Sequence, residues 1–190
     1  MRGWRPKGLV AAGIGTAIFV LLLTWVAAAV AGNLDPQRMV LTLQDLPTGF
    51  RLSSSRHVSP KDVANARGAS VNQVTGWGFL GGYSTAYFEY LGASKVAVGI
   101  GSGVTVYRTA TGAEASLLKA SCPPDTHEVS VGARIGDEAH LCAATGAGAY
   151  LLSWRRGRIV AQVSIGGISP LLASPTAAIR LALRQDKRMR

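Results

Sequence analysis

Apolar and polar residues alternate along several short segments of the chain, which is the pattern of half-buried β-strands. A strand is expected from Phe50, and further strands are expected over residues 83–90, 95–107, 127–131, 138–143, 150–154 and 159–165. Between the last two, Arg155–Arg156–Gly157 is a predicted tight turn, with glycine where a positive φ is needed. Strands joined by such short connections favour an antiparallel sheet.

Helical segments interrupt these strands at three places, each with an N-terminal capping signal. The predicted helices cover residues 60–66, 113–120 and 175–188, and their capping residues are Ser59, Thr111 and Ser174. Residues 68–82 are polar and glycine-rich and are expected to form a loop. Gly99, Gly101 and Gly103 fall within a predicted strand and are interpreted as a bulge or bend. The pattern therefore predicts an α+β domain, an antiparallel β-sheet packed by two main helices.

The longest apolar segment lies near the N-terminus, where an uncharged run from Gly8 to Gly32 follows Arg2, Arg5 and Lys7. As a helix rising about 1.5 Å per residue, this run exceeds the roughly 30 Å hydrocarbon core of a bilayer. The basic residues before it predict a cytoplasmic N-terminus and a single-pass signal-anchor in the cell membrane. The expected division is residues 1–7 in the cytoplasm, 8–32 in the lipid bilayer, 33–40 as a polar stalk and 41–190 as an extracytoplasmic domain.

A cleaved signal peptide is the alternative interpretation of the same run. Ala29–Val30–Ala31 has the small residues of a cleavage site, so the domain would be secreted after cleavage following Ala31. The length of the run and Trp25 near its outer end favour the uncleaved anchor. A polytopic membrane protein is excluded because only one segment is long enough to span, and the apolar content of 48% excludes a disordered chain.

The two cysteines, Cys122 and Cys142, both fall in the part expected outside the cytoplasm. An even pair in an oxidising compartment predicts one disulfide, which stabilises a loop of this length by about 3 kcal/mol. The alternative is a metal site that uses Cys142 and His140, with His127. Two cysteines and scattered histidines lack the spacing of a zinc site, so no metal is expected.

Positive charge is the main surface feature. The formal net charge is +10, and it remains +7 (17 basic, 10 acidic) when the three basic residues before the apolar run are left out. Two basic groups stand out: Arg155, Arg156 and Arg158 at the predicted turn, and Arg180, Arg184 and Lys187 along the last helix. They favour an anionic lipid or a cell-wall polymer as partner, whereas a solvated basic face that aids solubility is the alternative. Nucleic acid is not expected because the domain is exported.

Several short segments match known catalytic or cofactor-binding motifs, but the sequence around them does not support the corresponding site. The pattern Gly76-x-Gly78-x-x-Gly81 lacks the preceding strand and following helix that a dinucleotide site needs. Ser116-x-x-Lys119 and Ser70-x-Asn72 match two elements of serine acyltransferases, but they occur in reversed order and the third element, Lys-Thr-Gly, is missing. His57, His127 and His140 have no sequence link to a nucleophile. No catalytic residue and no cofactor are therefore expected.

Aromatic residues are concentrated in residues 77–90. In the strand portion they are interpreted as core. Trp77 and Phe79, which are flanked by glycines, are instead the candidates for an exposed binding lip.

Several short segments occur in a familiar order. They are Asp45–Phe50 (DLPTGF), Val104–Ala110, Ile135–Ala139 (IGDEA), Arg155–Ala161 (RRGRIVA) and Leu183–Asp186 (LRQD). This set resembles uncharacterised exported or membrane-anchored bacterial proteins with a single extracytoplasmic α+β domain. More distantly, the layout resembles extracytoplasmic sensor domains of bacterial membrane kinases, although this chain carries no kinase module. The resemblance implies a fold and a location but no activity.

The resulting hypothesis is a membrane-anchored, non-catalytic domain of the bacterial envelope that binds a ligand, an anionic polymer or a protein partner. The alternative is a small extracytoplasmic hydrolase whose site forms only in three dimensions. A pocket that gathers His57, His127 or His140 with a carboxylate or a serine would favour the hydrolase.

Overall fold

The computed structural model describes residues 34–190 except 92–94, 121, 146–147 and 169–172, so the predicted anchor over residues 8–32 lies outside the described residues. Within the described ranges, no helix combines the length and apolarity needed to cross a membrane. Residues 35–190 form one compact unit that holds every described strand and the disulfide. A fragment of residues 33–190 therefore contains the complete core and is expected to fold by itself.

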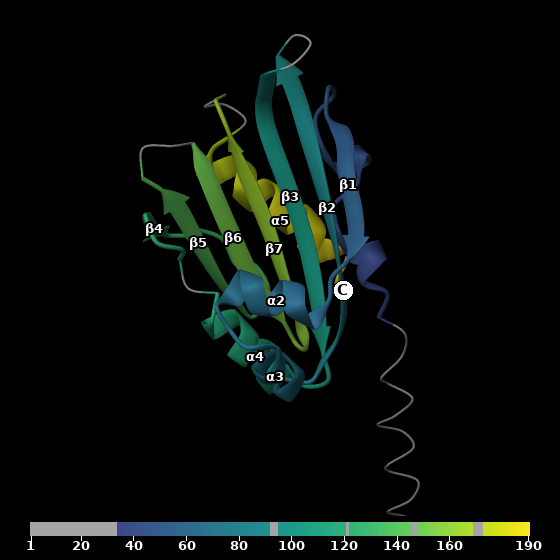
Figure 1. Cartoon of the computed structure of the whole chain (residues 1–190). Coiled ribbons are helices and arrows are strands. Elements are labelled where there is room, and N and C mark those ends of the chain that lie inside the picture. Colours follow the sequence, from purple (N-terminus) through teal and green to yellow (C-terminus); the bar gives the residue numbers. More distant parts are fainter. Residues whose placement is uncertain (1–33, 92–94, 121, 146–147, 169–172) are drawn as a thin grey trace, which may run out of the picture. The chain divides into compact units, whose positions relative to one another are not determined.

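A seven-stranded antiparallel sheet is the centre of this unit (Figure 1). Its strands are β1 (Arg51–His57), β2 (Phe79–Leu91), β3 (Lys95–Tyr107), β4 (Thr126–Val129), β5 (Glu138–Ala144), β6 (Ala149–Arg156) and β7 (Ile159–Gly167). They are arranged in the order β1-β2-β3-β7-β6-β5-β4, so that β3 and β7 pair near the middle of the sheet. The α+β prediction is confirmed for this domain.

Helices lie on both faces of the sheet. The α-helices are α2 (Pro60–Arg67), α3 (Val71–Gly76), α4 (Ala110–Leu118) and α5 (Pro175–Lys187), and two 3-10 helices, η1 (Pro36–Met39) and η2 (Leu43–Asp45), precede the sheet. In Figure 1, α2, α3 and α4 lie in front of one end of the sheet, whereas α5 lies behind it. The prediction of two main helices is therefore incomplete, because α2 and α3 also bury apolar side chains in a cluster of their own.

Capping hydrogen bonds decide where the helices begin. Ser59 and Ser174 accept backbone N–H groups of α2 and α5, as predicted. The cap of α4 is Thr109 rather than Thr111, because Thr109 has an extended backbone and accepts the N–H of Gly112 at 3.1 Å. The predicted loop over residues 68–82 is wrong: Ser70 forms a capping box and starts α3 despite the polar composition of the segment.

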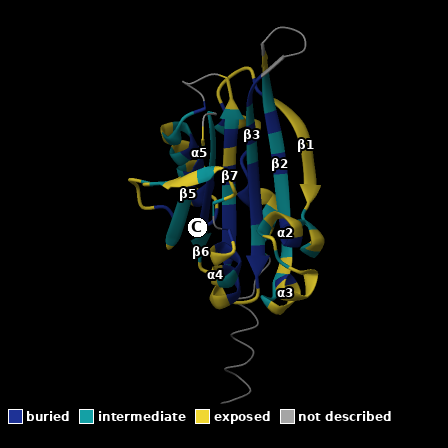
Figure 2. Ribbon diagram, turned by 60° about the vertical axis from the view of Figure 1, so that its left-hand side comes forward, coloured by how far each residue is buried: buried dark blue, intermediate teal, exposed yellow. Residues whose placement is uncertain are grey.

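Side chains of β3 alternate between the two faces, and this alternation separates a core from an open surface. Ser102 donates to Gln185 of α5 at 2.9 Å, which places the even-numbered residues of β3 on the α5 face. Gln162 of β7, which pairs with Gly103, contacts Arg67 of α2, so the odd-numbered residues face α2. Figure 2 shows the central strands as the most buried part of the sheet. The residues buried between the sheet and α5 include Leu152, Trp154, Val163, Ile165, Ala178, Leu181 and Ala182.

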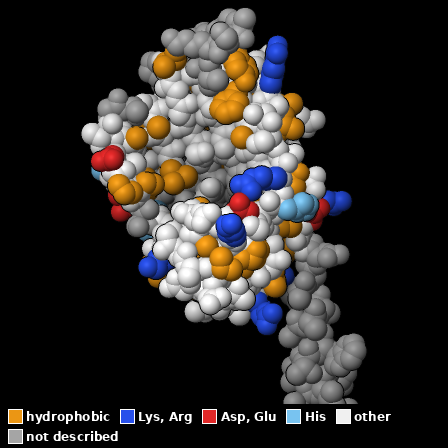
Figure 3. Space-filling view, in the orientation of Figure 1, with side chains coloured by type: hydrophobic (Ala, Val, Ile, Leu, Met, Phe, Trp, Pro, Cys, Tyr) orange, Lys and Arg blue, Asp and Glu red, His pale blue; other side chains and the backbone are white. Residues whose placement is uncertain are grey.

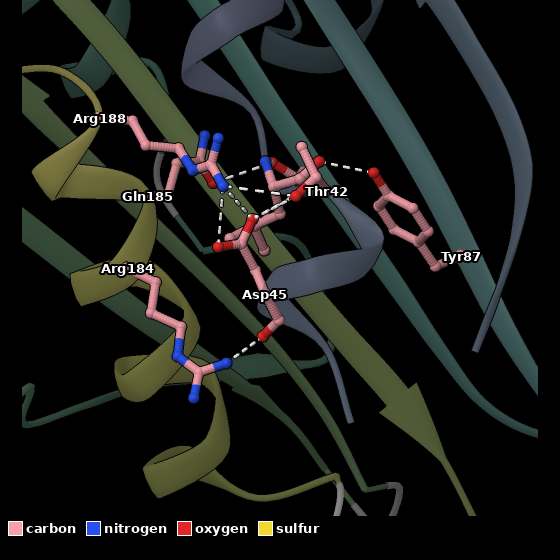
Figure 4. Close-up of polar contacts among 8 residues, drawn as sticks. Thr42, Asp45, Tyr87, Arg184, Gln185 and Arg188 are labelled. Atoms are coloured by element: carbon pink, nitrogen blue, oxygen red, sulfur yellow. Dashed lines mark hydrogen bonds and ion pairs between the residues drawn. The ribbon is translucent and has the colours of Figure 1, made fainter. Parts of the chain in front are cut away.

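A polar network fastens the segment before β1 to the sheet and to α5 (Figure 4). The Ser102 hydroxyl accepts the Leu41 N–H at 3.0 Å, and the Tyr87 hydroxyl donates to the Leu41 carbonyl at 2.5 Å. The Gln185 amide closes the network by donating to the carbonyl of Gly103 at 3.1 Å. Met39 and Val40 are buried, so the residues predicted as the end of a stalk are packed on the domain.

Ion pairs join the segments on which the bacterial resemblance was based. Arg188 donates to both Asp45 oxygens, at 3.0 and 2.8 Å, and Arg184 donates to the Asp45 carbonyl (Figure 4). Arg156 donates two hydrogen bonds, of 2.8 and 2.6 Å, to the Asp186 carboxylate. Burial opposes the ionisation of Asp45 and Asp186, yet the hydrogen bonds they accept outweigh burial and hold the pKa of each carboxyl below its usual value.

The turn between β6 and β7 is held from the side by Asp137. Its carboxylate accepts the Gly157 N–H at 2.7 Å and an Arg155 N–H at 3.3 Å. Gly136, just before it, has φ +59°, and a Cβ there would lie 2.2 Å from the Arg155 carbonyl oxygen. Only glycine fits this position without moving β6. The short segments therefore have a structural role, which is to join the turn, η2 and α5 to the sheet.

Candidate ligand-binding groove

The sheet face that carries α2 is covered by helices at one end only, and a groove of about 490 Å³ lies on the other end. Its lining is mostly apolar and comes from six strands, β2 to β7. The lining residues include the small residues Ala86, Gly99, Gly101, Ala144, Ala149, Ser164 and Gly166, and the larger Phe88 and Leu151. Figure 3 shows this face with a pale hollow beyond the helices and basic side chains along the lower edge of the hollow.

Small residues on neighbouring strands create the groove. Gly99, Gly101 and Gly103 stand on the same face of β3, and the register of β3 with β2 and with β7 is regular across all three. Their interpretation as a bulge or bend is therefore wrong; the register shifts between β2 and β3 lie elsewhere. Because these glycines lack side chains, the neighbouring side chains of Phe88, Ser164 and Gln162 lie over Gly99, Gly101 and Gly103 respectively. Ser164, on the central strand β7, is exposed.

A second, smaller pocket of about 140 Å³ lies next to the groove, under α2. Its sheet residues include Ser84, Gly103 and Gln162, which lie one same-face step, about 6.6 Å, from Ala86, Gly101 and Ser164 on β2, β3 and β7. The helix contributes Asp62, Val63, Ala66 and Arg67. The pocket therefore begins where the floor of the groove ends.

Arg67 is a positively charged side chain of this pocket that has no acidic partner among the described residues. Its guanidinium donates to Gln162 Oε1 at a long 3.4 Å, and in the part of the chain that the structure describes it has no carboxylate partner. Burial lowers the pKa of Arg67. Asp62 lines the same pocket but is engaged by Arg56 at 2.8 Å, and hydrogen bonds from Ser59 and then Arg56 hold the pKa of Asp62 below its usual range. Among the described residues, Arg67 is thus a half-buried cation that no carboxylate pairs with.

His140 forms the cluster that most resembles a catalytic site. Its Nδ1 lies 2.9 Å from Glu128 and its Nε2 lies 3.2 Å from Glu138, beside a pocket of about 230 Å³ near Cys122. Ser153 is its cross-strand neighbour on β6. Both ring nitrogens are already bonded to carboxylates, so the imidazole has no free nitrogen with which to activate that serine. The cluster is an ion-pair network rather than a catalytic triad.

The His140 network predicts a measurable titration. Hydrogen bonding to Glu128 raises the pKa of His140, so the NMR titration midpoint of its ring should lie above the ordinary value of about 6.5. Glu128→Gln should lower that midpoint, whereas Glu114→Gln, an exposed change on α4, should leave it unchanged.

The same shift sets the sign of a stability effect. A raised pKa in the folded state stabilises the fold below the unfolded pKa, and this contribution is lost as pH rises through the folded pKa. Glu128→Gln should therefore destabilise the domain at about pH 5 and have little effect at about pH 9. A midpoint that does not move in Glu128→Gln would show that the contact is not an ion pair in solution.

The predicted disulfide is confirmed: Cys122 and Cys142 are bonded, with their Cα atoms 5.4 Å apart. It ties the segment after α4 to β5, and Cys142 also lines the groove. Both thiols are consumed by this bond, so the alternative metal site loses its cysteine ligand. Among the described residues, no group of three acidic, histidine or cysteine side chains is placed to hold a metal ion.

The basic residues predicted to bind a polyanion are divided between internal pairing and exposure. Arg155 and Arg156 at the end of β6 are half-buried and pair with Asp137 and Asp186. Along α5, Arg180, Arg184 and Lys187 are exposed, and Arg158 is half-buried. These residues do not line the groove. A polyanion partner for them stays a prediction.

Trp77 and Phe79, the predicted binding lip, lie at the junction between α3 and β2. Both are half-buried and pack against the clusters beneath α2 and α4, and Phe79 contacts the ring of Tyr107 edge-to-face. They line neither the groove nor the Arg67 pocket, so a binding lip at these residues stays a prediction. Ser116 is a core residue, buried and hydrogen-bonded to the Tyr107 hydroxyl at 2.7 Å.

Comparison with known proteins gives a likeness in fold. No family model matches the chain, and no curated protein matches it in sequence. Among solved structures, the chain is similar to the extracellular domain of PknH from Mycobacterium tuberculosis, with a TM-score of 0.52 and 11% sequence identity. The match covers 80% of this chain and 94% of that domain. At this identity the likeness concerns the fold alone.

Proposed function

We propose that this chain is a non-catalytic ligand-binding domain, held outside the cytoplasm by a membrane anchor over residues 8–32. The groove is the observation that carries the binding function, because an open apolar hollow on the central strands of a sheet leaves apolar surface in water. A disulfide, which persists in oxidising compartments, supports the location, as do the basic residues before the apolar run. The fold of an extracellular domain agrees with it.

The ligand of this site is an elongated apolar molecule or segment. The groove runs across the sheet, because its lining comes from six neighbouring strands, β2 to β4 in the sheet order, and covers no more than three residues' length of each. Five steps of about 4.8 Å between neighbouring strands give it a length of about 24 Å. Its polar lining is small, so the ligand would gain affinity mainly from buried apolar area, at about 25 cal/mol per Å². A serine exposed at the centre, Ser164, gives a position from which the groove can be filled by mutation.

Binding can be tested with a neutral apolar fluorophore, N-phenylnaphthylamine, and the fragment of residues 33–190. The fragment should enhance the emission of the probe, and Ser164→Trp should weaken binding at least about tenfold. A tenfold loss is about 1.4 kcal/mol, or about 60 Å² of apolar contact, which is well within the area of an indole ring.

Ser55→Trp is the matched control, because Ser55 is an exposed strand residue on the edge strand β1 and does not line the groove. It should bind the probe as the unmodified fragment does. Absence of binding to the unmodified fragment, or equal binding to Ser164→Trp, would overturn the groove as the binding site.

A further inference from the structure

Arg67 gives the groove a charged end, and this end defines the class of ligand. Two cationic side chains, Arg56 and Arg67, and one carboxylate, Asp62, line the pocket under α2. Arg56 and Asp62 are paired at 2.8 Å, so the charge of Arg67 is the one left over. We propose, building on the proposed function, that groove and pocket together bind a single-chain fatty carboxylate, with its chain on the groove floor and its carboxylate on Arg67.

The position of Arg67 is suited to binding a ligand carboxylate. It stands in the last turn of α2, where a cation interacts favourably with the helix dipole, and that interaction needs no acidic partner. The helix thus holds the guanidinium at the pocket, while its five N–H donors have a single long hydrogen bond to Gln162. A ligand carboxylate could accept two parallel N–H groups from this fork, which the Gln162 amide oxygen cannot.

Charge complementarity selects a carboxylate over a phosphate. A carboxylate brings one negative charge to a pocket with one surplus positive charge. A phosphate monoester carries about −1.5 to −2 at neutral pH, and its additional charge would face Asp62 in the same pocket. The remaining polar side chains of the pocket, Ser84, Thr105 and Gln162, are neutral.

The closeness of the two hollows supports a single ligand. On each of β2, β3 and β7, a residue that lines the pocket lies one same-face step from a residue that lines the groove. A chain lying on the groove floor therefore reaches the pocket when its charged end extends along β3 past Gly101 toward Gly103. An apolar ligand without a charged end would fill the groove and leave Arg67 unpaired.

Displacement of N-phenylnaphthylamine from fragment 33–190 by dodecanoate, dodecanol and dodecyl phosphate, each below its micelle concentration, tests the proposal. Dodecanoate should displace the probe at a concentration at least about tenfold lower than dodecanol, because only the carboxylate can accept charge-assisted hydrogen bonds from Arg67. Dodecyl phosphate should be weaker than dodecanoate. Tighter binding of the phosphate would overturn the carboxylate assignment.

Arg67→Met keeps the aliphatic stem and removes the charge, so it should abolish the preference for dodecanoate while the affinity for dodecanol stays the same. Arg67→Lys keeps a cation and should retain part of the preference, which provides a second test if the methionine variant folds poorly. Lys61→Met, an exposed change on the same helix, is the matched control and should leave the preference intact.

The outcomes separate this proposal from the proposed function. Equal displacement by dodecanoate and dodecanol, both blocked by Ser164→Trp, would leave the groove as a binding site and overturn the role of Arg67. A preference that persists in Arg67→Met would overturn it as well. If none of the amphiphiles nor the probe binds, the proposed function itself fails.

Discussion

Replacing Asp186 with asparagine is expected to lower the free energy of unfolding by about 2–4 kcal/mol at neutral pH. Asp186 is 1% exposed and accepts two hydrogen bonds from Arg156, so the variant leaves that guanidinium without its counter-charge. Breaking a buried ion pair costs about 3–5 kcal/mol, and the expected value is somewhat smaller because the Arg156 side chain keeps 28% of its exposure. Urea unfolding of fragment 33–190 measures the difference.

The effect of Asp186→Asn should depend on pH in a defined direction. A carboxyl with a lowered pKa in the folded state stabilises the fold above its unfolded pKa, about 3.9, and this contribution is lost as pH falls through the folded pKa. The difference between the two proteins should therefore shrink in acid. Glu114→Gln, at an exposed position of α4, is the matched control and should change the unfolding free energy by less than about 0.5 kcal/mol. A neutral-pH effect of Asp186→Asn as small as that of the control would contradict the structural role of this pair.

Removing the disulfide is expected to cost about 3 kcal/mol. Cys122 and Cys142 are separated by 20 residues, and closing a loop of this size restricts the unfolded chain by that amount. Replacing both cysteines with alanine should lower the urea midpoint accordingly, and the fragment should stay folded because β4 and β5 remain paired in the ladder.

Reduction provides the internal control for that experiment. Dithiothreitol should lower the stability of the unmodified fragment to about that of the double-alanine variant and should leave the variant itself unchanged. If the reductant affects both proteins equally, or neither, the bond does not stabilise the domain in the expected way. Because Cys142 lines the groove, probe binding to the double-alanine variant also reports whether the groove depends on this crosslink.

The elements of the fold were largely predictable from local sequence. Alternation identified the strands within a few residues, because the period of two is a property of each strand and needs no partner. Serine and proline together located the starts of α2 and α5 for the same reason. The exception is α3, a helix of six residues too short to show a periodic pattern, although Ser70 and Gln73 did carry a capping-box signal.

Contacts between distant segments were not predictable in this way. The familiar segments around Asp45, Asp137 and Asp186 could be read from the sequence, but their pairing with Arg188, Arg155 and Arg156 depends on how the sheet and α5 pack. The contacts of Arg155 and Arg156, at the turn between β6 and β7, were not predictable from the sequence either. The sequence showed these arginines as charge available to a partner, whereas both are engaged inside the domain.

The sequence by itself determined the α+β composition, the starts of α2 and α5 and the pairing of the only two cysteines, since these follow from local patterns and from number. Only the tertiary structure decided the candidate site. Gly101 forms a groove because the register places it between Ala86 and Ser164, and Arg67 faces Gln162, 95 residues away, because α2 packs on that end of the sheet. Six strands and one helix must come together before these residues form a groove beside a charged pocket, and no local pattern encodes that arrangement.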